Sequence, residues 1–161
     1  MKKTEYIMST ILEVCAGTYR SALAAALGGA DRIELCSGLS EGGLTPSYGT
    51  LRAALKIPNM KKHVLIRPRS GDFLYSRSEL SVMADDIALA AELGADGVVI
   101  GALTKDGEVD MDGMGLLMEK SGTMDVTFHR AFDVCKNPLK ALEDIISLGC
   151  THILTSGQAA T

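Results

Sequence analysis

Short runs of apolar and β-branched residues alternate along the chain with longer segments in which apolar residues recur at helical spacing. Side chains repeat every 2 residues in a strand and every 3.6 in a helix, so the pattern predicts strands that alternate with helices. Repeated βαβ units of this kind build a parallel sheet. The six predicted strands span residues 11–17, 32–37, 63–69, 97–102, 126–132 and 152–157.

Several of the intervening segments have recognisable helix starts. Thr45 and Asn137 each precede a proline, an order that places a capping residue before Pro at the first helical position. Another helix is expected over residues 78–93, where apolar residues recur near helical spacing. A further helix, over residues 112–121, is predicted from a segment rich in Met and Gly.

Three of the predicted helices end in similar sequences. These are LGGAD at residues 27–31, LGAD at residues 93–96 and LGCT at residues 148–151, each followed by a predicted strand. A Gly just past a helix adopts the left-handed conformation that turns the chain tightly into the next strand. One turn used three times favours a single barrel or a single wound sheet over separate modules.

Two features favour a barrel over a doubly wound sheet. No G-x-G-x-x-G follows the first predicted strand, and polar residues lie at the C-terminal ends of many strands rather than at one switch point. We therefore expect an α/β fold of the TIM-type (β/α)8 barrel class, truncated to about six strand–helix units. Residues 1–10 would form an irregular lead-in and residues 11–161 the incomplete barrel domain. Because the sixth strand would lack a neighbour, we expect either a truncated chain or completion by another copy in a homo-oligomer.

Composition narrows the partners and the compartment. Apolar residues make up 47% of the 161 residues, aromatic residues only 4%, so the core must be mainly aliphatic. A net charge of −4 without a long Lys or Arg run argues against a nucleic-acid partner. No run approaches ~18 apolar residues, so no membrane span is expected. No secretory signal is expected either, because acidic Glu5 follows the N-terminal lysines and no apolar segment lies between them and Ile11. Four cysteines without CxxC spacing are interpreted as reduced thiols in a cytoplasmic protein.

The alternate positions of the predicted strands carry an unusual set of polar side chains. In a barrel one alternate face meets the helices and the other points into the lumen. A lumen built only for stability uses Val, Ile and Leu, because burying an unpaired ion costs on the order of several kcal/mol. The pattern predicts a functional site, with a structural network of the two glutamates and Arg67 as the alternative. The lumen-facing residues are Glu13, Glu34, Arg67 and His129, with Cys15 and Cys36 one step higher and Arg69 further along the third strand.

Other polar residues are expected at the two ends of the lumen. Asp133 directly follows the fifth strand and could line the mouth. Arg69 ends the third predicted strand, and Asp72 lies in the loop after it (70–75), whose Gly and aromatic residues suit a substrate-facing loop, although a plain surface loop is the alternative. His63 and His152 fall at strand starts, on the face where polar residues usually serve stability.

Cys15 and Cys36 form a distinct pair of candidate ligands. Each follows a lumen-facing Glu by two residues on neighbouring predicted strands, and adjacent strands lie ~4.8 Å apart. Two thiolates suit Cu(I), a soft ion for which two ligands suffice. The alternative is that both are small buried core residues, the commonest setting of a free Cys.

These residues lie in motifs that resemble the CutC family of copper homeostasis proteins. The similar stretches are LEVC (12–15), DRIELC (31–36), EGGLTPS (41–47), IRPRSGDF (66–73), TFHRAFD (127–133) and ILTSG (153–157). The resemblance implies a TIM-type barrel, a cytoplasmic setting and copper handling. It also implies that Cys15 and Cys36 stand where the family's proposed Cu(I)-binding cysteines fall, and that the family barrel continues beyond residue 157 into a Gly-rich segment and two more strands.

The polar lumen supports a second hypothesis, an enzyme that acts on a small anionic metabolite. Glu13 or Glu34 would serve as general acid or base. Arg67, aided by Arg69, would clamp the anion, and His129 would shuttle a proton. A third interpretation is that an incomplete barrel does not hold its lumen residues in a competent arrangement.

Overall fold

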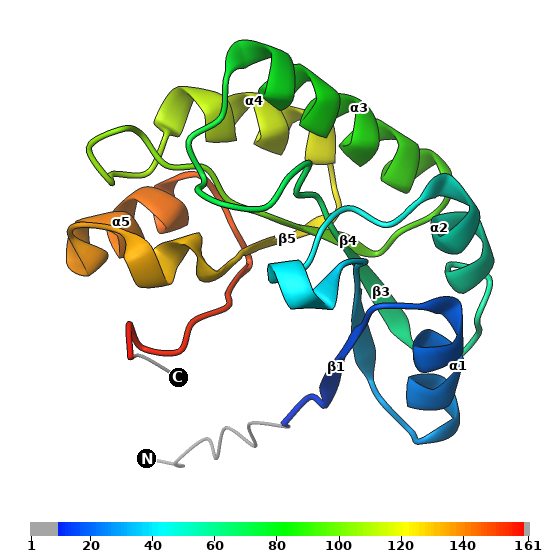
Figure 1. Ribbon diagram of the computed structural model, residues 1–161. Helices are drawn as coiled ribbons and strands as arrows, with labels where there is room; N and C mark the ends of the chain where they lie inside the picture. The colour runs from blue at the N-terminus through cyan, green and yellow to red at the C-terminus, as the bar shows by residue number, and fades with distance from the viewer. Residues whose placement is uncertain (1–9, 160–161) are drawn as a thin grey trace, which may run out of the picture.

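The computed structural model describes residues 10–159, which form a curved parallel sheet with helices on its outer side (Figure 1). Most of the predicted lead-in, residues 1–9, lies outside the described residues. The strands are β1 (Glu13–Ala16), β2 (Arg32–Leu35), β3 (Lys61–Leu65), β4 (Gly97–Ile100), β5 (Asp125–Phe128) and β6 (His152–Ile153). The helices are α1 (Tyr19–Leu27), α2 (Tyr48–Ala54), α3 (Arg77–Glu92), α4 (Met111–Ser121) and α5 (Pro138–Ser147), with 3-10 turns η1 (Leu39–Glu41) and η2 (Arg130–Val134).

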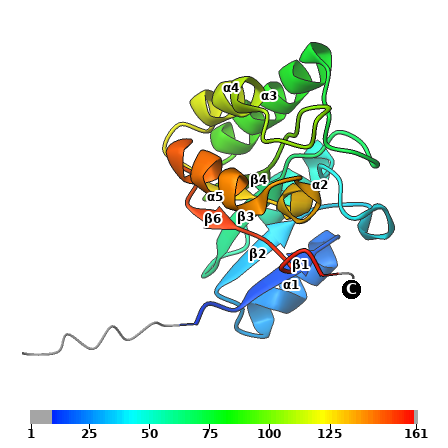
Figure 2. The same ribbon diagram turned by 90° about the vertical axis from the view of Figure 1, so that its left-hand side faces the viewer.

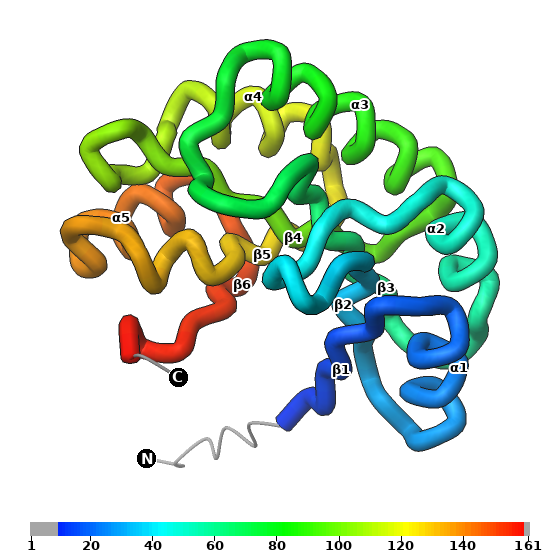
Figure 3. Tube along the Cα trace, in the orientation of Figure 1, coloured from blue at the N-terminus to red at the C-terminus, as the bar shows by residue number. Residues whose placement is uncertain are grey.

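The strands pair in chain order from β1 to β6, and all pairs are parallel. The Cα trace in Figure 3 shows them side by side along the inside of the arc. The sheet curls strongly. As a result, Nη1 of Arg32 on β2 lies only 3.2 Å from Nε2 of His152 on β6, four strands away. Six parallel strands with crossover helices form the larger part of a TIM-type barrel, which confirms the predicted fold class.

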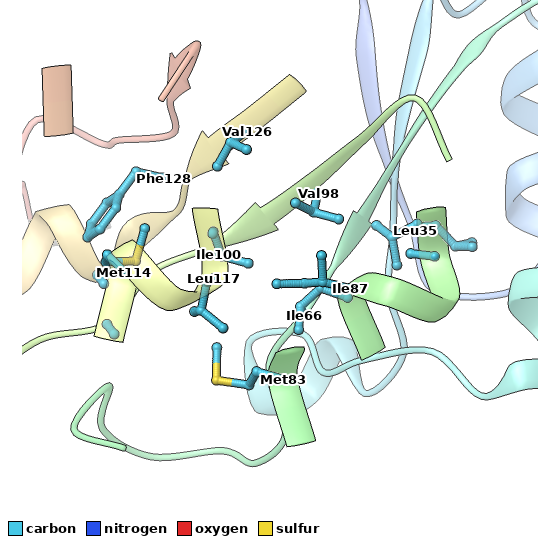
Figure 4. Packing of buried hydrophobic residues seen from close by; sticks show 14 of the residues in the cluster. Leu35, Ile66, Met83, Ile87, Val98, Ile100, Met114, Leu117, Val126 and Phe128 are labelled. Carbon is cyan, nitrogen blue, oxygen red and sulfur yellow. The ribbon is translucent and has the colours of Figure 1, made fainter. Parts of the chain in front are cut away.

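The core lies between the outer face of the sheet and the helices. Figure 4 shows Val98 from β4, and Ile66 directly after β3, meeting Met83 and Ile87 from α3. Helix α3 lies beside α4 over this part of the sheet (Figures 1 and 2). The buried set is almost entirely aliphatic, as the scarcity of aromatic residues predicts, and Phe128 is its largest fully buried member. No helix among residues 10–159 is long and apolar enough to cross a bilayer.

The αβ turns match the prediction from the repeated Leu-Gly sequences. Gly29, Gly94 and Gly149 have φ values of 83°, 85° and 84°, the left-handed conformation expected after a helix. In each turn the next backbone N–H reaches back to a carbonyl five residues earlier; the Ala95 N–H, for example, donates to the Ala90 carbonyl over 3.0 Å. This is the hydrogen bond of a Schellman motif, and it delivers each strand at the same height in the sheet.

One of the two predicted caps is wrong. Asn137 caps α5 as predicted, with Pro138 at the first helical position. Helix α2 instead begins at Tyr48 and is capped by Ser47, two residues after the predicted Thr45. Thr45 is engaged elsewhere, since its N–H donates to the carbonyl of Arg67 and its Oγ1 accepts from the N–H of Arg67.

The strands are shorter than predicted, because the C-terminal part of each predicted run is loop. Strand β3 ends at Leu65, for example, whereas residues 63–69 were expected to be extended within the sheet. Pro68 has no N–H for the ladder, and the backbone of Arg67 bonds Thr45 instead of a strand. These loops rise from the carboxyl ends of the strands and surround the site.

Candidate functional site

A cavity of about 520 Å³ opens at the carboxyl ends of the strands, on the concave side of the sheet. The alternation along each strand works as predicted there, since Val14 and Ile33 pack in the core while their neighbours face the lumen. Six of the predicted site residues line this lumen pocket: Glu13, Cys15, Glu34, Arg67, His129 and Asp133. The sequence therefore identified most of the polar wall of the pocket.

Cys15 and Cys36 lie together, as predicted from their strand positions. Their Sγ atoms are 3.6 Å apart, and the Cys15 Sγ also lies 3.8 Å from Glu34 Oε1. Cys36 is fully buried, whereas Cys15 is exposed toward the pocket. The shared hydrogen bond raises the pKa of Cys15, with burial adding to the rise, and lowers the pKa of Cys36. Either thiol can donate the hydrogen bond between the two sulfur atoms, so the two cysteines titrate as a coupled pair.

The two glutamates have different environments although they sit on neighbouring strands. Glu34 is 8% exposed, and burial, followed by the proximity of Cys15 and Glu13, raises its pKa to about 8. Glu13 forms an ion pair with Arg32, the residue that starts β2. At neutral pH the pocket therefore holds a protonated Glu34 beside a Glu13 that is paired with Arg32. The alternative prediction, a network of both glutamates with Arg67, is wrong, because neither forms an ion pair with that side chain.

Arg67 is a buried guanidinium held by backbone carbonyl groups. Nη1 donates to the carbonyl oxygens of Glu41 and Gly43 over 2.8 and 2.9 Å, and Nη2 donates to that of Gly71 over 2.9 Å. Its Cζ lies 5.2 Å from the ring centre of Phe73. Among residues 10–159 no carboxylate forms an ion pair with it, so its charge remains available to a ligand.

His129 is held as a neutral ring with one nitrogen engaged. Its Nδ1 accepts a hydrogen bond from the Ala131 N–H over 3.2 Å, so the ring proton sits on Nε2. Burial and the nearby Arg67 lower its pKa to about 3. The ring fits beside Gly101, where an added Cβ would lie 2.6 Å from its atoms. This geometry suits a fixed hydrogen-bond donor better than the proton shuttle expected from the sequence.

Asp133 lines the pocket but its carboxylate is already occupied. It accepts hydrogen bonds from Thr155 Oγ1 and from the N–H groups of Ser156 and Gln158, and it pairs with Arg130. Burial alone would raise its pKa, yet these donors together hold the pKa well below its usual range. Asp133 therefore fixes the loop after β6 against η2 and shapes the mouth of the pocket.

Arg69 and Asp72 do not line the lumen pocket. Arg69 was expected to face the lumen, but it forms ion pairs with Asp72 and Glu79 and lies over the ring of Tyr75. The alternation that places Arg67 inward stops at Pro68, where the chain has already left the sheet. The lumen-facing position predicted for Arg69 is therefore wrong.

Sequence reasoning missed three residues of the site. Phe73 was recognised only as a member of a loop, yet its ring contacts both Arg67 and His129. Arg130 follows His129 directly and lines the pocket beside Asp133. Gly101 follows β4, and its significance depends on what packs against it in three dimensions, which no local pattern reveals.

At the opposite end of the lumen, His63 and His152 lie as their positions at strand starts predicted. Their ring centres are 5.8 Å apart, and His63 Nε2 lies 3.7 Å from an Asp125 oxygen. Burial lowers the pKa of His63 to about 4, so it is neutral at pH 7. An added Cβ at Gly97 would lie 2.7 Å from this ring, which shows how tightly it is packed.

Few side chains among residues 10–159 are arranged so that they could bind a metal ion together. Within residues 10–159 no group of three or more His, Cys, Asp or Glu side chains could hold a metal ion. A metal that needs four protein ligands, such as structural Zn²⁺, is therefore not served by the described residues. The pair of thiols remains as a ligand set for a soft ion that accepts two ligands.

Structural comparison places this geometry among known barrels. A crystal structure from Streptococcus agalactiae, of a proposed copper homeostasis protein named CutC, has a TM-score of 0.87 and 35% identity to this chain. The match covers 93% of this chain and 74% of that one. An aldolase matches with a TM-score of 0.58 at 15% identity, a likeness that shows the barrel fold alone.

Sequence comparison is more specific. A CutC family protein from Bacteroides thetaiotaomicron is 56% identical over 162 residues, and a CutC family protein from Chromobacterium violaceum is 53% identical over 154 residues. The chain spans 63% and 62% of the length of these two relatives. The model of the CutC family matches residues 10–161, nearly the whole chain. By fold and by sequence, the chain belongs to the CutC family.

Proposed function

We propose that this protein binds Cu(I) through the thiolates of Cys15 and Cys36, as a copper homeostasis protein of the CutC type. The observation that carries the proposal is the Sγ–Sγ distance of 3.6 Å between two reduced cysteines on neighbouring strands. A small movement of either side chain would place one ion between the two sulfur atoms. The copper homeostasis role proposed for the S. agalactiae relative supports the same reading.

The chemistry of the pair favours a soft monovalent ion. Thiolates are the ligands that select Cu(I), whereas carboxylates and carbonyl oxygens select hard ions. Both thiols would lose their protons as the ion binds, because the thiolate is the form that ligates a metal. Cys15 faces the pocket, so the ion has a route from the mouth of the barrel.

Anaerobic titration with Cu(I) against a competing chelator tests this proposal. The unmodified protein is expected to bind one Cu(I), and a Cys15→Ser/Cys36→Ser variant is expected to lose at least 100-fold in affinity, because hydroxyl groups are poor ligands for this ion. A Cys135→Ser/Cys150→Ser variant is the matched control, since those thiols lie outside the lumen pocket. Equal Cu(I) affinity in both double variants would contradict the proposal.

A second candidate function is a TIM-barrel enzyme that performs acid–base chemistry on a small anionic metabolite. The observation that favours it is the cluster of Glu34, Arg67 and His129 around a cavity of about 520 Å³. Glu34, protonated at neutral pH, would act as the acid, and burial, aided by Cys15 and Glu13, would maintain its raised pKa. Arg67 and His129 would bind the anion.

The remaining candidate substrate contacts would act at the rim. Asp133 would order the loop after β6, while Arg69 and Asp72 would order the loop that carries Phe73. Loss of ligand binding in Arg67→Ala, with a smaller loss in Arg69→Ala, is the expected result of a metabolite screen. A ligand whose binding ignored Arg67 would argue against this function.

We further propose that the protein acts in the cytoplasm and self-associates. Four reduced cysteines suit a reducing compartment. Leu27 on α1 and Leu139 on α5 are 83% and 77% exposed, at the two ends of the arc, where a further copy could cover them. Sedimentation at increasing concentration should show a species larger than one chain, and a monomer at all concentrations would contradict self-association.

A further inference from the structure

Two buried side chains in the lumen pocket carry hydrogen-bond donors that have no acceptor among the described residues. These donors are Nε of Arg67 and Nε2 of His129, on residues that are 6% and 4% exposed. Buried polar groups in folded proteins are nearly always paired, so two unpaired donors in one pocket call for a ligand. Both residues line the cavity of about 520 Å³.

One edge of Arg67 donates to backbone carbonyl groups, whereas its Nε makes no hydrogen bond, and the equally unpaired Tyr75 hydroxyl lies near the guanidinium. A guanidinium carries five N–H groups, and three of those of Arg67 are donated to the carbonyl oxygens of Glu41, Gly43 and Gly71. The two that remain belong to Nε and Nη2, two nitrogens of one planar fork. That spacing matches the two oxygens of a single carboxylate, which a guanidinium binds with two parallel hydrogen bonds.

The charge balance of the pocket favours an anion with a single charge. Glu13 is paired with Arg32, and Asp133 is paired with Arg130. Within residues 10–159, Arg67 is the lining cation that no carboxylate pairs. One buried positive charge is neutralised by one negative charge, so a monocarboxylate suits the pocket better than a dianionic phosphate.

His129 supplies a third donor beside the guanidinium. Because Nδ1 accepts from the Ala131 N–H, the free Nε2 carries the proton and can donate but not accept. A donor next to a bound carboxylate fits an oxygen on the neighbouring carbon atom of the ligand. The apolar part of the wall, formed by Leu65, Val134 and Leu154, leaves room for a short hydrocarbon body.

Phe73 packs against both donor-bearing side chains. Its ring centre lies 5.2 Å from Cζ of Arg67 and 4.8 Å from the ring centre of His129. The ring keeps water away from both donors, and neither donor atom is exposed to solvent. A ligand would reach them after this ring moves, and the loop that carries it is anchored at Gly71 by Arg67 itself.

We propose that Arg67 and His129 form a carboxylate-binding subsite beneath Phe73, and that its ligand is a small monocarboxylate with an oxygen on the adjacent carbon, a 2-oxo acid. The subsite gives the second candidate function its substrate class. Its donors are distinct from the Cu(I) ligands proposed above, Cys15 and Cys36, although Cys15 lines the same cavity.

NMR titration of the protein at pH 7 with pyruvate and three comparison compounds tests the ligand class. Each comparison compound lacks one feature of pyruvate that the subsite is proposed to recognise. Pyruvate carries the carboxylate and the adjacent oxygen, isobutyrate replaces that oxygen by a methyl group, pyruvamide removes the charge, and inorganic phosphate replaces the carboxylate. Pyruvate is expected to bind about tenfold or more tightly than each of the others, the value of one charge-assisted hydrogen bond. Equal binding of pyruvate and pyruvamide, tighter binding of phosphate, or no binding of pyruvate would overturn the proposal.

Three variants assign the binding to the two donors. His129→Asn keeps an acceptor for the Ala131 N–H but lacks the Nε2 donor, so pyruvate should bind as weakly as isobutyrate does. Arg67→Lys keeps the charge without the fork and should lower pyruvate affinity about tenfold or more. Phe73→Ala should strengthen pyruvate binding by uncovering both donors. Circular dichroism confirms that each variant folds, and unchanged pyruvate affinity in a folded His129→Asn protein would contradict the assignment.

The Cys15→Ser/Cys36→Ser variant separates this proposal from the copper function. It should bind pyruvate as the unmodified protein does, whether or not Cu(I) binding is lost. Loss of pyruvate binding in this folded variant would place the ligand against the cysteines and refute the subsite. Failure of Cu(I) to bind the unmodified protein, with pyruvate binding intact, would refute only the copper function.

Discussion

Glu13 and Glu34 show how partners decide the state of a residue. They occupy the lumen face of neighbouring strands, yet Glu13 is charged against Arg32 while Glu34 is buried without a cation of its own. The sequence predicts that both face the lumen, because alternation along a strand is a local property. It does not predict the raised pKa of Glu34 or the ion pair of Glu13, since Arg32 reaches Glu13 only once β1 and β2 are paired.

The raised pKa of Glu34 makes a prediction about stability and pH. The folded protein holds a proton on this group up to about pH 8, whereas the unfolded chain releases it near 4.5. The stability contributed by Glu34 is therefore fully present below about pH 4.5 and is lost as the pH rises toward 8, at no more than about 1.4 kcal/mol per pH unit. Glu34→Gln should remove this loss.

Urea unfolding of the Glu34→Gln variant and of the unmodified protein at pH 5 and pH 8 measures the effect. When the pH is raised from 5 to 8, the free energy of unfolding of the variant should increase by roughly 1–3 kcal/mol relative to that of the unmodified protein. Comparing the two proteins at each pH cancels the contribution of the buried histidines. A stability difference that stays constant with pH would show that Glu34 is ionised in the folded protein.

Gly101 makes a second prediction at the residue scale. A Cβ there would lie 2.6 Å from the His129 ring, so Gly101→Ala should displace the imidazole and destabilise the fold by roughly 1–3 kcal/mol. Gly115, in the middle of α4 with open space around it, is the matched control, and Gly115→Ala should stabilise by about 0.5–1 kcal/mol. If chemical denaturation gave the same stability change for Gly101→Ala and Gly115→Ala, the His129 ring would be able to move aside without cost.

At the scale of single elements, caps and turns account for both the success and the error of sequence reasoning. The three αβ turns were predictable because a left-handed Gly after a helix is a local signal. The N-terminus of α2 was not, because Thr45 and Ser47 both qualify as caps and the outcome depends on Arg67, 22 residues after Thr45. The strand ends were overestimated for a similar reason, since apolar residues continue into loops that the rest of the fold buries.

The cap of α5 provides a prediction at this scale. Asn137 accepts a hydrogen bond from the Lys140 N–H, so Asn137→Ala should cost about 1 kcal/mol of stability. Asn137→Asp keeps an acceptor oxygen and should cost little. Denaturant midpoints of the two variants check this, and equal losses would indicate that the cap matters less than the proline that follows it.

At the scale of the whole molecule, the curvature of the sheet creates the site. Arg67 and His129 are 62 positions apart in the sequence and meet at one ring, that of Phe73, only because β3, β4 and β5 curl around a common lumen. The class of fold and the polar character of the lumen were predictable from periodicity. The unpaired donors, the ring that covers them and the engaged state of Asp133 were not, because each depends on contacts between loops.

X-ray absorption at the copper edge, on protein loaded with one equivalent of Cu(I) under anaerobic conditions, tests the central claim most directly. The account predicts that two sulfur atoms, from Cys15 and Cys36, coordinate the copper ion. This two-sulfur signal should be lost in the Cys15→Ser/Cys36→Ser variant. A first shell of nitrogen or oxygen atoms, or a two-sulfur shell that survives in the variant, would contradict it.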